Sequence, residues 1–214
     1  MIGFLGGTFD PIHNGHLHAA NTAAAALDLE HVHLVLAARP KHRAQPFAAI
    51  EHRWAMLELA VEGNERLRAD DRDVRRGTAT YTVETLEEVR AQYGPHVPLV
   101  WLLGVDAYQD LPTWHRWREV ASLAHLIVMR RPGHDTQLDA AMREFSDLHR
   151  TDELALLRRR PAGCVAFIEL PMLSVSSTDI RIRLRRGESV EQLLPSVVST
   201  YIKEHQLYRG PSCQ

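Results

Sequence analysis

The sequence predicts an α/β protein: a Rossmann-like parallel sheet with helices on both faces and a small helical portion at the C-terminal end. Two observations predict this class. Short apolar runs of strand length alternate with longer helical segments, as in proteins built on a parallel sheet. The first apolar run leads into a glycine-rich loop and then directly into a helix rich in Ala and Leu. We expect residues 1–214 to form a single domain, with its C-terminal helical part at roughly 174–208.

The first half of the chain contains short apolar runs and longer segments with helical composition or spacing. Predicted strands cover residues 2–6 and 31–37, weaker strand-like pieces cover 66–69 and 74–76, and predicted helices cover 16–29, 51–61 and 83–93. Two prolines and several basic or His residues indicate an exposed loop at residues 39–49. The alternation of strand and helix predicts βαβ units in this half.

The second half continues the same alternation, with strands between helical segments. Predicted strands cover residues 99–103, 126–129 and 165–170, helical turns cover 106–120, a charged helical segment covers 137–160, and predicted helices cover 179–186 and 197–205. No internal repeat or convincing linker divides the chain, which is why we expect one domain.

Composition and charge exclude several classes of partner. The formal net charge is −2 and 45% of the residues are hydrophobic, which is typical of a globular protein without a basic field for nucleic acid or an anionic membrane. No apolar run approaches the roughly 20 residues of a membrane-spanning helix, and the first residues do not have the pattern of a signal peptide. The two cysteines, Cys164 and Cys213, lack metal-ligand spacing. We therefore expect a cytoplasmic protein that binds neither nucleic acid nor membrane.

The glycine-rich loop at residues 6–16 has the features of a phosphate-binding site. In an open parallel sheet, ligands bind beyond the carboxyl ends of the strands, where this loop is expected. Glycines let backbone N–H groups approach an anion, and the following helix points its free N–H groups and positive dipole end to the same place. His13 and His16 are close enough in sequence to share one face of the first helical turn, and Gly15 removes a side chain between them.

Each of these features also has a simpler explanation. Adjacent glycines such as Gly6 and Gly7 occur in many tight turns, and two histidines at this spacing could be half of a metal site or a surface pair. No third metal ligand is evident nearby. The loop also has neither the Gly-x-Gly-x-x-Gly spacing of dinucleotide folds nor the Gly-Lys-Ser/Thr ending of a P-loop.

Residues 175–181 form a second candidate phosphate site. Ser176 and Asp179 have the spacing of a capping box, and a helix start of this kind needs no ligand. The same hydroxyls and free amides would also suit a phosphate, and Arg181 would lie within reach of the same anion. The residues alone leave both interpretations open.

The two segments together resemble a known superfamily. Residues 7–16 are similar to the signature of the nucleotidyltransferases with a His-x-Gly-His motif, and residues 176–181 are similar to their Ser-Ser-Thr-x-Ile-Arg motif. The resemblance implies that His16, His13 and Arg181 are catalytic, with His16 important in the transition state. The ATP-binding residues that it implies are Gly7, Thr8, Phe9, His13, His16, Gly104, Asp106, Arg131, Ser177, Thr178 and Arg181.

Over nearly its whole length the chain also resembles the bacterial nicotinate mononucleotide adenylyltransferases. The matching stretches are residues 71–73 with 76, 80–86, 103–106, 111–114 with 116–117, 130–133, 193–195, 201–202 and 207–209. The resemblance implies that the mononucleotide is bound by Tyr81, Thr82, Trp114, His42 and Arg43.

Several of these assignments suit the chemistry of the substrates. Trp114 could stack on a pyridine ring, while Tyr81 and Thr82, at a helix start, could offer N–H groups to the ring carboxylate. Asp106 follows a buried strand and could accept ribose hydroxyls, and Arg131 could serve the adenosine side. Packing is the alternative for Trp114 and Tyr81, and an N-cap is the alternative for Asp106.

The loop with His42 and Arg43 departs from the family pattern. Lys41 stands where the family tends to have a second proline before the histidine. A solvated loop therefore competes with a role of His42 and Arg43 in binding the phosphate of the mononucleotide.

The resemblance implies an enzyme that joins the AMP part of ATP to nicotinate mononucleotide and releases pyrophosphate, a reaction of NAD biosynthesis. The partners expected are these small molecules, with Mg²⁺ held mainly by ATP and no dedicated metal site; an oligomer is possible but not predicted. The nearest alternative accepts nicotinamide mononucleotide, or both acceptors. A non-catalytic nucleotide-sensing module and an RNA-acting fragment of a synthetase are more distant alternatives, because both motifs are intact and no basic face is evident.

Overall fold

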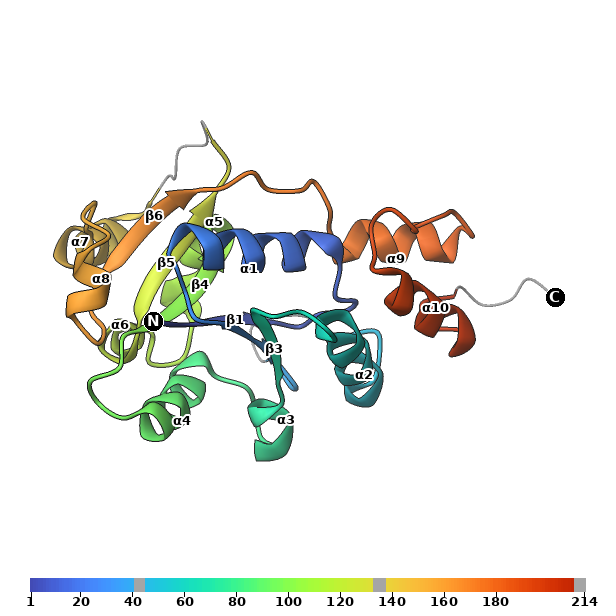
Figure 1. The fold of residues 1–214 in the computed structure, drawn as a ribbon, viewed down its shortest axis with the longest axis horizontal. Coiled ribbons are helices and arrows are strands. Elements are labelled where there is room, and N and C mark those ends of the chain that lie inside the picture. Colours follow the sequence, from blue (N-terminus) through green and yellow to red (C-terminus); the bar gives the residue numbers. More distant parts are fainter. Residues whose placement is uncertain (41–44, 133–137, 210–214) are drawn as a thin grey trace.

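A parallel sheet covered by helices forms the centre of the computed structural model, which describes residues 1–40, 45–132 and 138–209 (Figure 1). Within these residues the sheet has six strands in the order β3-β2-β1-β4-β5-β6, and every neighbouring pair is parallel. The strands are β1 (Ile2–Gly7), β2 (Val32–Leu36), β3 (Leu67–Asp70), β4 (Leu99–Gly104), β5 (His125–Arg130) and β6 (Val165–Glu169). The predicted parallel α/β architecture is confirmed.

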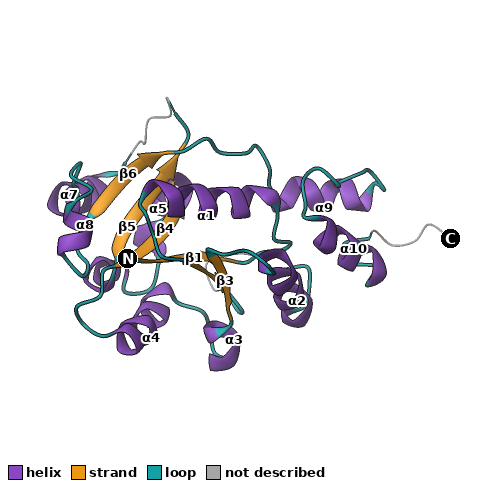
Figure 2. Cartoon of the chain, viewed as in Figure 1, coloured by secondary structure: helices purple, strands orange, loops and turns teal. Residues whose placement is uncertain are grey.

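Helices cover both faces of the sheet, as predicted (Figure 2). They are α1 (Asn14–Ala26), α2 (Ile50–Val61), α3 (Arg72–Arg76), α4 (Thr82–Tyr93), α5 (Val105–Gln109), α6 (Val120–Leu123), α7 (Ala140–His149), α8 (Leu156–Arg159), α9 (Ser177–Arg185) and α10 (Ser196–Glu204), with 3-10 turns η1 (Leu111–Thr113) and η2 (Trp117–Glu119). Residues of α1, α2, α8, α9 and α10 share one buried apolar cluster with the sheet, and residues of α4, α5, α6 and α7 share a second. The sheet therefore separates two apolar layers.

Strand β1 shows how the sequence divides its side chains between these layers. Ile2 and Phe4 belong to the cluster beneath α4, whereas Leu5 belongs to the cluster beneath α1. Alternate residues of a strand point to opposite faces, so a sheet covered on both sides needs apolar residues in succession. This requirement explains why short continuous apolar runs predicted the strands.

The strand order places one junction at the centre of the sheet. From β1 the chain proceeds outward through β2 and β3 on one side, and through β4, β5 and β6 on the other. In sheets of this order, loops that leave β1 and β4 diverge to opposite faces and leave a crevice beyond the carboxyl ends of these strands. The glycine-rich loop follows β1 directly, so the fold puts it at this crevice.

One predicted strand is wrong. Residues 74–76 belong to the short helix α3, which starts after Asp71 and ends at Gly77. Gly77 has a φ of 71°, in the left-handed region that ends helices readily when the residue is glycine. The segment is too short for its apolar spacing to distinguish a strand from a helical turn.

The charged segment at residues 137–160 is not one helix, and residue 137 lies outside the described residues. Its two helices, α7 and α8, are separated because the chain between them pairs with β6: the N–H of Thr151 donates to the carbonyl of Val165 at 2.9 Å. The predicted helical turns at residues 106–120 are confirmed as α5, η1 and η2.

The C-terminal helices pack against the first helices of the chain. Ile180 of α9 and Val198 and Ile202 of α10 belong to the same buried cluster as residues of α1 and α2. Both helices were predicted, although each starts one or two residues earlier than expected. In the described part of the chain, no helix is both long and apolar enough to span a bilayer.

Candidate functional site

The glycine-rich loop and the start of α1 form the centre of the candidate site. The helix begins at Asn14 rather than at residue 16 as predicted, because His13 is its N-cap and its Nδ1 accepts a hydrogen bond from the His16 N–H at 3.3 Å. In the neutral imidazole one nitrogen accepts and the other carries the proton. This capping bond therefore leaves Nε2 of His13 as the donor.

The two histidine rings of the motif lie one on the other. The centroids of the His13 and His16 rings are 3.6 Å apart with an interplanar angle of 19°, and the ring of Phe9 meets His16 edge-on at 5.1 Å. His13 is 5% exposed, and this burial lowers the pKa of His13 to about 4. At neutral pH the ligand-free protein thus holds His13 as a neutral hydrogen-bond donor.

A side chain at residue 15 would crowd this arrangement. A Cβ at Gly15 would lie 3.0 Å from Nδ1 of His13 and 3.4 Å from Cβ of Val175. The first distance is tighter than ordinary van der Waals contact, and it involves the very nitrogen that caps α1. The contact with Val175 also shows that the segment before α9 reaches the start of α1.

The start of α9 is bonded directly to the glycine-rich loop. The hydroxyl of Ser177 donates to the carbonyl of Pro11 at 3.0 Å, and Nη1 of Arg181 donates to the carbonyl of Asp10 at 2.6 Å. Arg181 also donates from Nη2 to the hydroxyl of Thr178 at 3.3 Å. The two segments predicted to bind phosphate are therefore brought together, although they are far apart in the sequence.

The capping interpretation of the second segment is confirmed alongside this convergence. Ser176 is the N-cap of α9, and its hydroxyl accepts from the Asp179 N–H at 3.1 Å. The carboxylate of Asp179 pairs with Nε of Arg183 at 2.9 Å, so Arg183 is engaged within its own helix. A capped helix start and a phosphate site are compatible, because one cap satisfies only part of the first turn.

Arg53 was not predicted to belong to the site, but it supports the loop. Its guanidinium donates to the carbonyls of Thr8 and Ala37, both at 2.9 Å, and of Ala38 at 2.8 Å, while Nε donates to Ala48 at 3.2 Å. The residue is 1% exposed, and burial lowers the pKa of Arg53 from its usual value. In the sequence Arg53 reads as an ordinary helix residue, since only the folded chain brings these carbonyls together.

The residues predicted to bind the pyridine ring lie at the start of α4 and in the segment after η1. Tyr81 is the N-cap residue of α4, has no side-chain capping bond, and lies with its ring 4.7 Å from that of His115. His115 follows Trp114, so Tyr81 and Thr82 are brought close to the Trp114 segment. Trp114 is half-buried.

The neighbouring Trp117 has a different environment. Its ring packs against Phe145 of α7 with centroids 5.1 Å apart, and the guanidinium of Arg118 covers it at 4.3 Å. Trp117 is therefore engaged in packing.

The segment after β2 is joined to the segment before α4. The Arg39 N–H donates to the hydroxyl of Thr80 at 3.2 Å, the Thr80 N–H donates back to the Arg39 carbonyl at 3.1 Å, and Nη1 of Arg39 donates to the Gly77 carbonyl at 2.8 Å. His42 and Arg43 lie at residues 41–44, outside the described residues, so their assignment stays a prediction.

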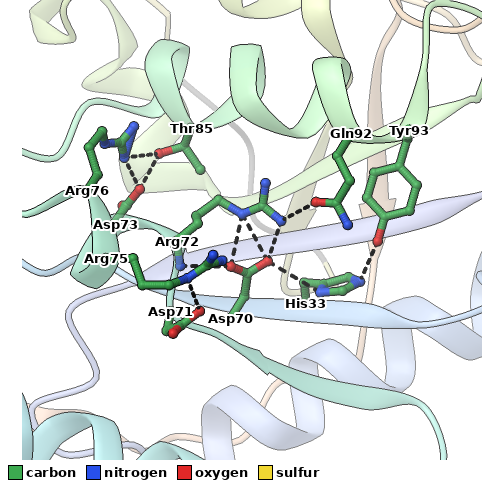
Figure 3. A network of polar contacts seen from close by, with 10 residues as sticks. All are labelled: His33, Asp70, Asp71, Arg72, Asp73, Arg75, Arg76, Thr85, Gln92 and Tyr93. Carbon is green, nitrogen blue, oxygen red and sulfur yellow. Dashed lines mark hydrogen bonds and ion pairs between the residues drawn. The ribbon is translucent and has the colours of Figure 1, made fainter.

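A buried polar network fixes α3 and α4 behind this segment (Figure 3). Asp73 accepts from the hydroxyl of Thr85 at 2.6 Å and pairs with Arg76, which also donates to Thr85 at 3.0 Å. Burial raises the pKa of Asp73, with these donors acting in the opposite direction. The network ties α3 to the first turns of α4, next to Thr82.

The remaining predicted ATP residues lie at the carboxyl ends of β4 and β5. Gly104 rather than Asp106 is the N-cap of α5, so the capping alternative for Asp106 is wrong. Asp106 is exposed in the first turn of that helix. Arg131 is exposed directly after β5. A Cβ at Gly104 would meet no atom within 4 Å, so open space adjoins the end of β4.

A surface cavity of about 540 Å³ lies beside the predicted phosphate site rather than in it. Its lining residues are Ala38, Arg39, Gln45, Pro46, Ala48, Ala49, Ile50, Glu51, Arg53 and Ala79. Arg53 both lines this cavity and donates to the carbonyl of Thr8. Imidazole and guanidinium groups gather instead at the converging helix starts, and among the described residues the cavity lining contains none of the predicted ligand residues. Among the described residues, no group of three or more His, Cys, Asp or Glu could hold a metal ion.

Comparisons with known proteins indicate the family of the chain. The model of the cytidylyltransferase-like family matches residues 4–183. A probable nicotinate-nucleotide adenylyltransferase of Pseudomonas syringae pv. tomato is 43% identical over 211 residues, which cover 99% of this chain and 95% of the relative. A protein of the same name from Yersinia enterocolitica is 40% identical and covers 98% of this chain and 96% of that relative.

A solved structure has the same fold at low sequence identity. The nicotinic acid mononucleotide adenylyltransferase of Plasmodium falciparum, complexed with NaAD, superposes with a TM-score of 0.71 at 16% identity, covering 97% of this chain and 96% of that one. At this identity the likeness shows the fold alone.

The parallel sheet and the two converging helix starts define a nucleotidyltransferase of the cytidylyltransferase-like class. Within that class the full-length relatives are more specific than the fold. The chain belongs to the nicotinate-nucleotide adenylyltransferase family.

Proposed function

We propose that this enzyme transfers the adenylyl group of ATP to nicotinate mononucleotide, giving nicotinate adenine dinucleotide and pyrophosphate in the cytoplasm. One observation supports this most strongly: the starts of α1 and α9 converge, joined by the bonds from Ser177 to Pro11 and from Arg181 to Asp10. The positive dipole ends of two helices, two imidazoles and a guanidinium suit a polyphosphate.

The reaction we propose is a direct in-line displacement. An oxygen of the 5′-phosphate of the mononucleotide forms a bond to the α-phosphorus of ATP, the bond from this phosphorus to the bridging oxygen breaks, and its electron pair leaves with pyrophosphate. The acceptor phosphate is already a nucleophile at neutral pH, so no covalent enzyme intermediate is needed. The protein has to align two anions and stabilise charge on the leaving group.

On the ATP side, His13 would donate from Nε2 to a phosphate oxygen, and His16 would act where charge develops in the transition state. Ser177, Thr178 and Arg181 would hold the β- and γ-phosphates. The backbone of Gly7, Thr8 and Phe9 would line the polyphosphate, and Gly104, Asp106 and Arg131 would bind the adenosine part. Mg²⁺ would arrive with ATP, held by phosphate oxygens, and would neutralise part of their charge.

On the acceptor side, Trp114 would stack on the pyridine ring, and the N–H groups of Tyr81 and Thr82 would bind its carboxylate. His42 and Arg43 would bind the phosphate of the mononucleotide. This half of the proposal is supported by the closeness of α4 to the segment that contains Trp114 and His115.

The test is a pyrophosphate-release assay with ATP, Mg²⁺ and either nicotinate mononucleotide or nicotinamide mononucleotide as acceptor. We expect a higher kcat/KM with the nicotinate form, because backbone N–H groups favour a carboxylate over an amide. Equal values with both would indicate dual specificity, and no release with any mononucleotide would refute the proposed function.

A further inference from the structure

The carboxylate of Asp10 joins three segments that are far apart in the sequence. Its Oδ2 accepts from the Phe47 N–H at 2.7 Å, and its Oδ1 accepts from the Ala48 N–H at 3.1 Å and from the hydroxyl of Tyr208 at 2.7 Å. Asp10 is only 4% exposed, so these three donors provide the hydrogen bonds that water provides to a surface carboxylate. The glycine-rich loop, the segment before α2 and the C-terminal tail therefore meet at one side chain.

Arg181 is held by the same group of residues. Besides its bond to the Asp10 carbonyl, its Nη1 lies 3.9 Å from Oδ2 of Asp10, and its guanidinium carbon lies 4.6 Å from the centroid of the Phe47 ring. Phe47 is in turn fixed by its N–H bond to Asp10. Most of the contacts that orient the guanidinium thus depend, directly or through Phe47, on the position of Asp10.

Tyr208 determines how strongly Asp10 attracts this guanidinium. Burial and the charge of Asp10 raise the pKa of Tyr208 above its usual range, so its hydroxyl remains protonated and donates. A carboxylate that accepts three hydrogen bonds has less unsatisfied charge to offer a neighbouring cation than one that accepts two. Loss of the hydroxyl would therefore draw Arg181 towards Asp10, in competition with a phosphate.

We propose that Tyr208 is a positioning residue for the adenylyl transfer, and that it acts through Asp10 on the guanidinium of Arg181. This inference rests on the proposed function, in which Arg181 stabilises the pyrophosphate leaving group. It gives the C-terminal tail a part in the reaction although Tyr208 touches none of the reacting atoms.

The test is Tyr208→Phe, with Tyr201→Phe as the matched control. The hydroxyl of Tyr201 is bonded to Nδ1 of His52 at 3.0 Å, which ties α10 to α2 without reaching the glycine-rich loop. Each variant removes one phenolic hydroxyl from the C-terminal part and keeps the ring that packs against the same buried cluster. Both variants should fold, and melting curves should show the larger loss of stability for Tyr208→Phe, because its hydroxyl bonds a buried carboxylate.

Pyrophosphate release should distinguish them. We expect Tyr208→Phe to lower kcat about tenfold, as the loss of one hydrogen bond to a charged group would, and to change the KM for the mononucleotide less than about twofold. Tyr201→Phe should keep both constants within about twofold of wild type. In an Arg181→Lys background, which removes the guanidinium, Tyr208→Phe should lower kcat by a much smaller factor than it does in wild type.

Three results would overturn the inference: wild-type kcat for Tyr208→Phe, an equal loss of kcat for Tyr201→Phe, or an undiminished loss in the Arg181→Lys background. If Tyr208→Phe does not fold at the assay temperature, the variants and wild type are compared at a lower temperature at which Tyr208→Phe is folded, and wild-type kcat there would overturn the inference. Failure of the proposed function would look different, because wild-type enzyme would then release no pyrophosphate with any mononucleotide.

Discussion

The imidazole ring of His13 lies parallel to that of His16 in the first turn of α1, with 3.6 Å between the ring centroids. The stack joins a side chain that caps the helix to one that we propose acts on the polyphosphate. Because Nδ1 of His13 accepts the N–H of His16, each histidine helps to orient the other. Substitutions at the two positions are therefore expected to have different consequences.

Replacing His16 should affect turnover more than folding. We expect His16→Ala to lower kcat by on the order of 10²–10³, the usual cost of removing a transition-state donor. The control is His18→Ala, two residues further along α1, where the ring contacts the carbonyl of Pro171 instead of the loop. Rates of pyrophosphate release measure both variants, and normal turnover of His16→Ala would remove this residue from the mechanism.

Replacing His13 should change how stability depends on pH. The pKa of His13 is lowered to about 4 in the folded protein, so as pH falls below about 6.5, the usual value, the unfolded chain takes up the proton first. As pH falls from about 6.5 to about 4, His13 therefore lowers the free energy of unfolding, by about 2 kcal/mol at pH 5. Urea unfolding of wild type and His13→Gln at pH 7 and pH 5 measures this loss. The variant should lose less stability between the two, and an equal loss would contradict the burial argument.

The fold could be predicted from the sequence because its signals are local. A strand buried on both faces must be apolar along its length, so Leu99–Gly104 and His125–Arg130 are visible as short apolar runs. The helix α3 could not be predicted in the same way. Its contacts run to Thr85 in the next helix, and a five-residue segment has too few positions to show a period.

The candidate site was predictable only where a motif marked it. His13, His16 and Arg181 belong to recognisable patterns, and their convergence follows from the fold. Arg53 belongs to no such pattern, and Tyr208 lies in a stretch that resembles the family, 207–209, without an assigned role. Their importance lies in carbonyls and a carboxylate that become neighbours only after folding, the extreme case being Tyr208 and Asp10, which are separated by 198 positions.

Gly104→Ala tests the proposed adenosine site with little risk to the fold. A methyl group at this position meets no atom within 4 Å in the ligand-free protein, and the φ of −78° is ordinary for alanine. The only structural cost is a poorer N-cap for α5, about 1 kcal/mol at most. We expect the KM for ATP to rise several-fold with the KM for the mononucleotide unchanged. If neither constant moves, ATP does not approach the end of β4.

Trp114→Ala tests the acceptor side. Because Trp114 is proposed to stack on the pyridine ring, its loss should raise the KM for nicotinate mononucleotide more than the KM for ATP. Trp117→Ala is the control: that ring packs on Phe145, so its loss should lower the melting temperature and leave the ratio of the two KM values unchanged. Equal effects of Trp114→Ala on both substrates would instead assign it a packing role.

Two arginines of the short helix α3 allow a comparison of a buried and an exposed ion pair (Figure 3). Arg72 contacts Asp70 at 2.7 Å with side chains that are 6% and 5% exposed, whereas Arg75 contacts Asp71 at 2.8 Å with side chains that are 70% and 38% exposed. Arg72→Met should leave the Asp70 carboxylate buried without its main partner and cost about 3–5 kcal/mol of unfolding free energy. Arg75→Met should cost less than about 1 kcal/mol.

The pKa of Asp70 predicts how acid changes the effect of Arg72→Met on stability. Burial alone would raise the pKa of Asp70, but hydrogen bonds from His33 and Arg72 and the charge of Arg72 outweigh it and lower the pKa well below its usual value. The stability from this carboxylate is therefore present above the usual pKa of about 4 and is lost as pH falls further. Urea unfolding should show a large difference in unfolding free energy between Arg72→Met and wild type near pH 7. This difference should be smaller near pH 3. A gap of constant size would mean that the pair does not titrate with folding and that Arg72 stabilises α3 by packing instead.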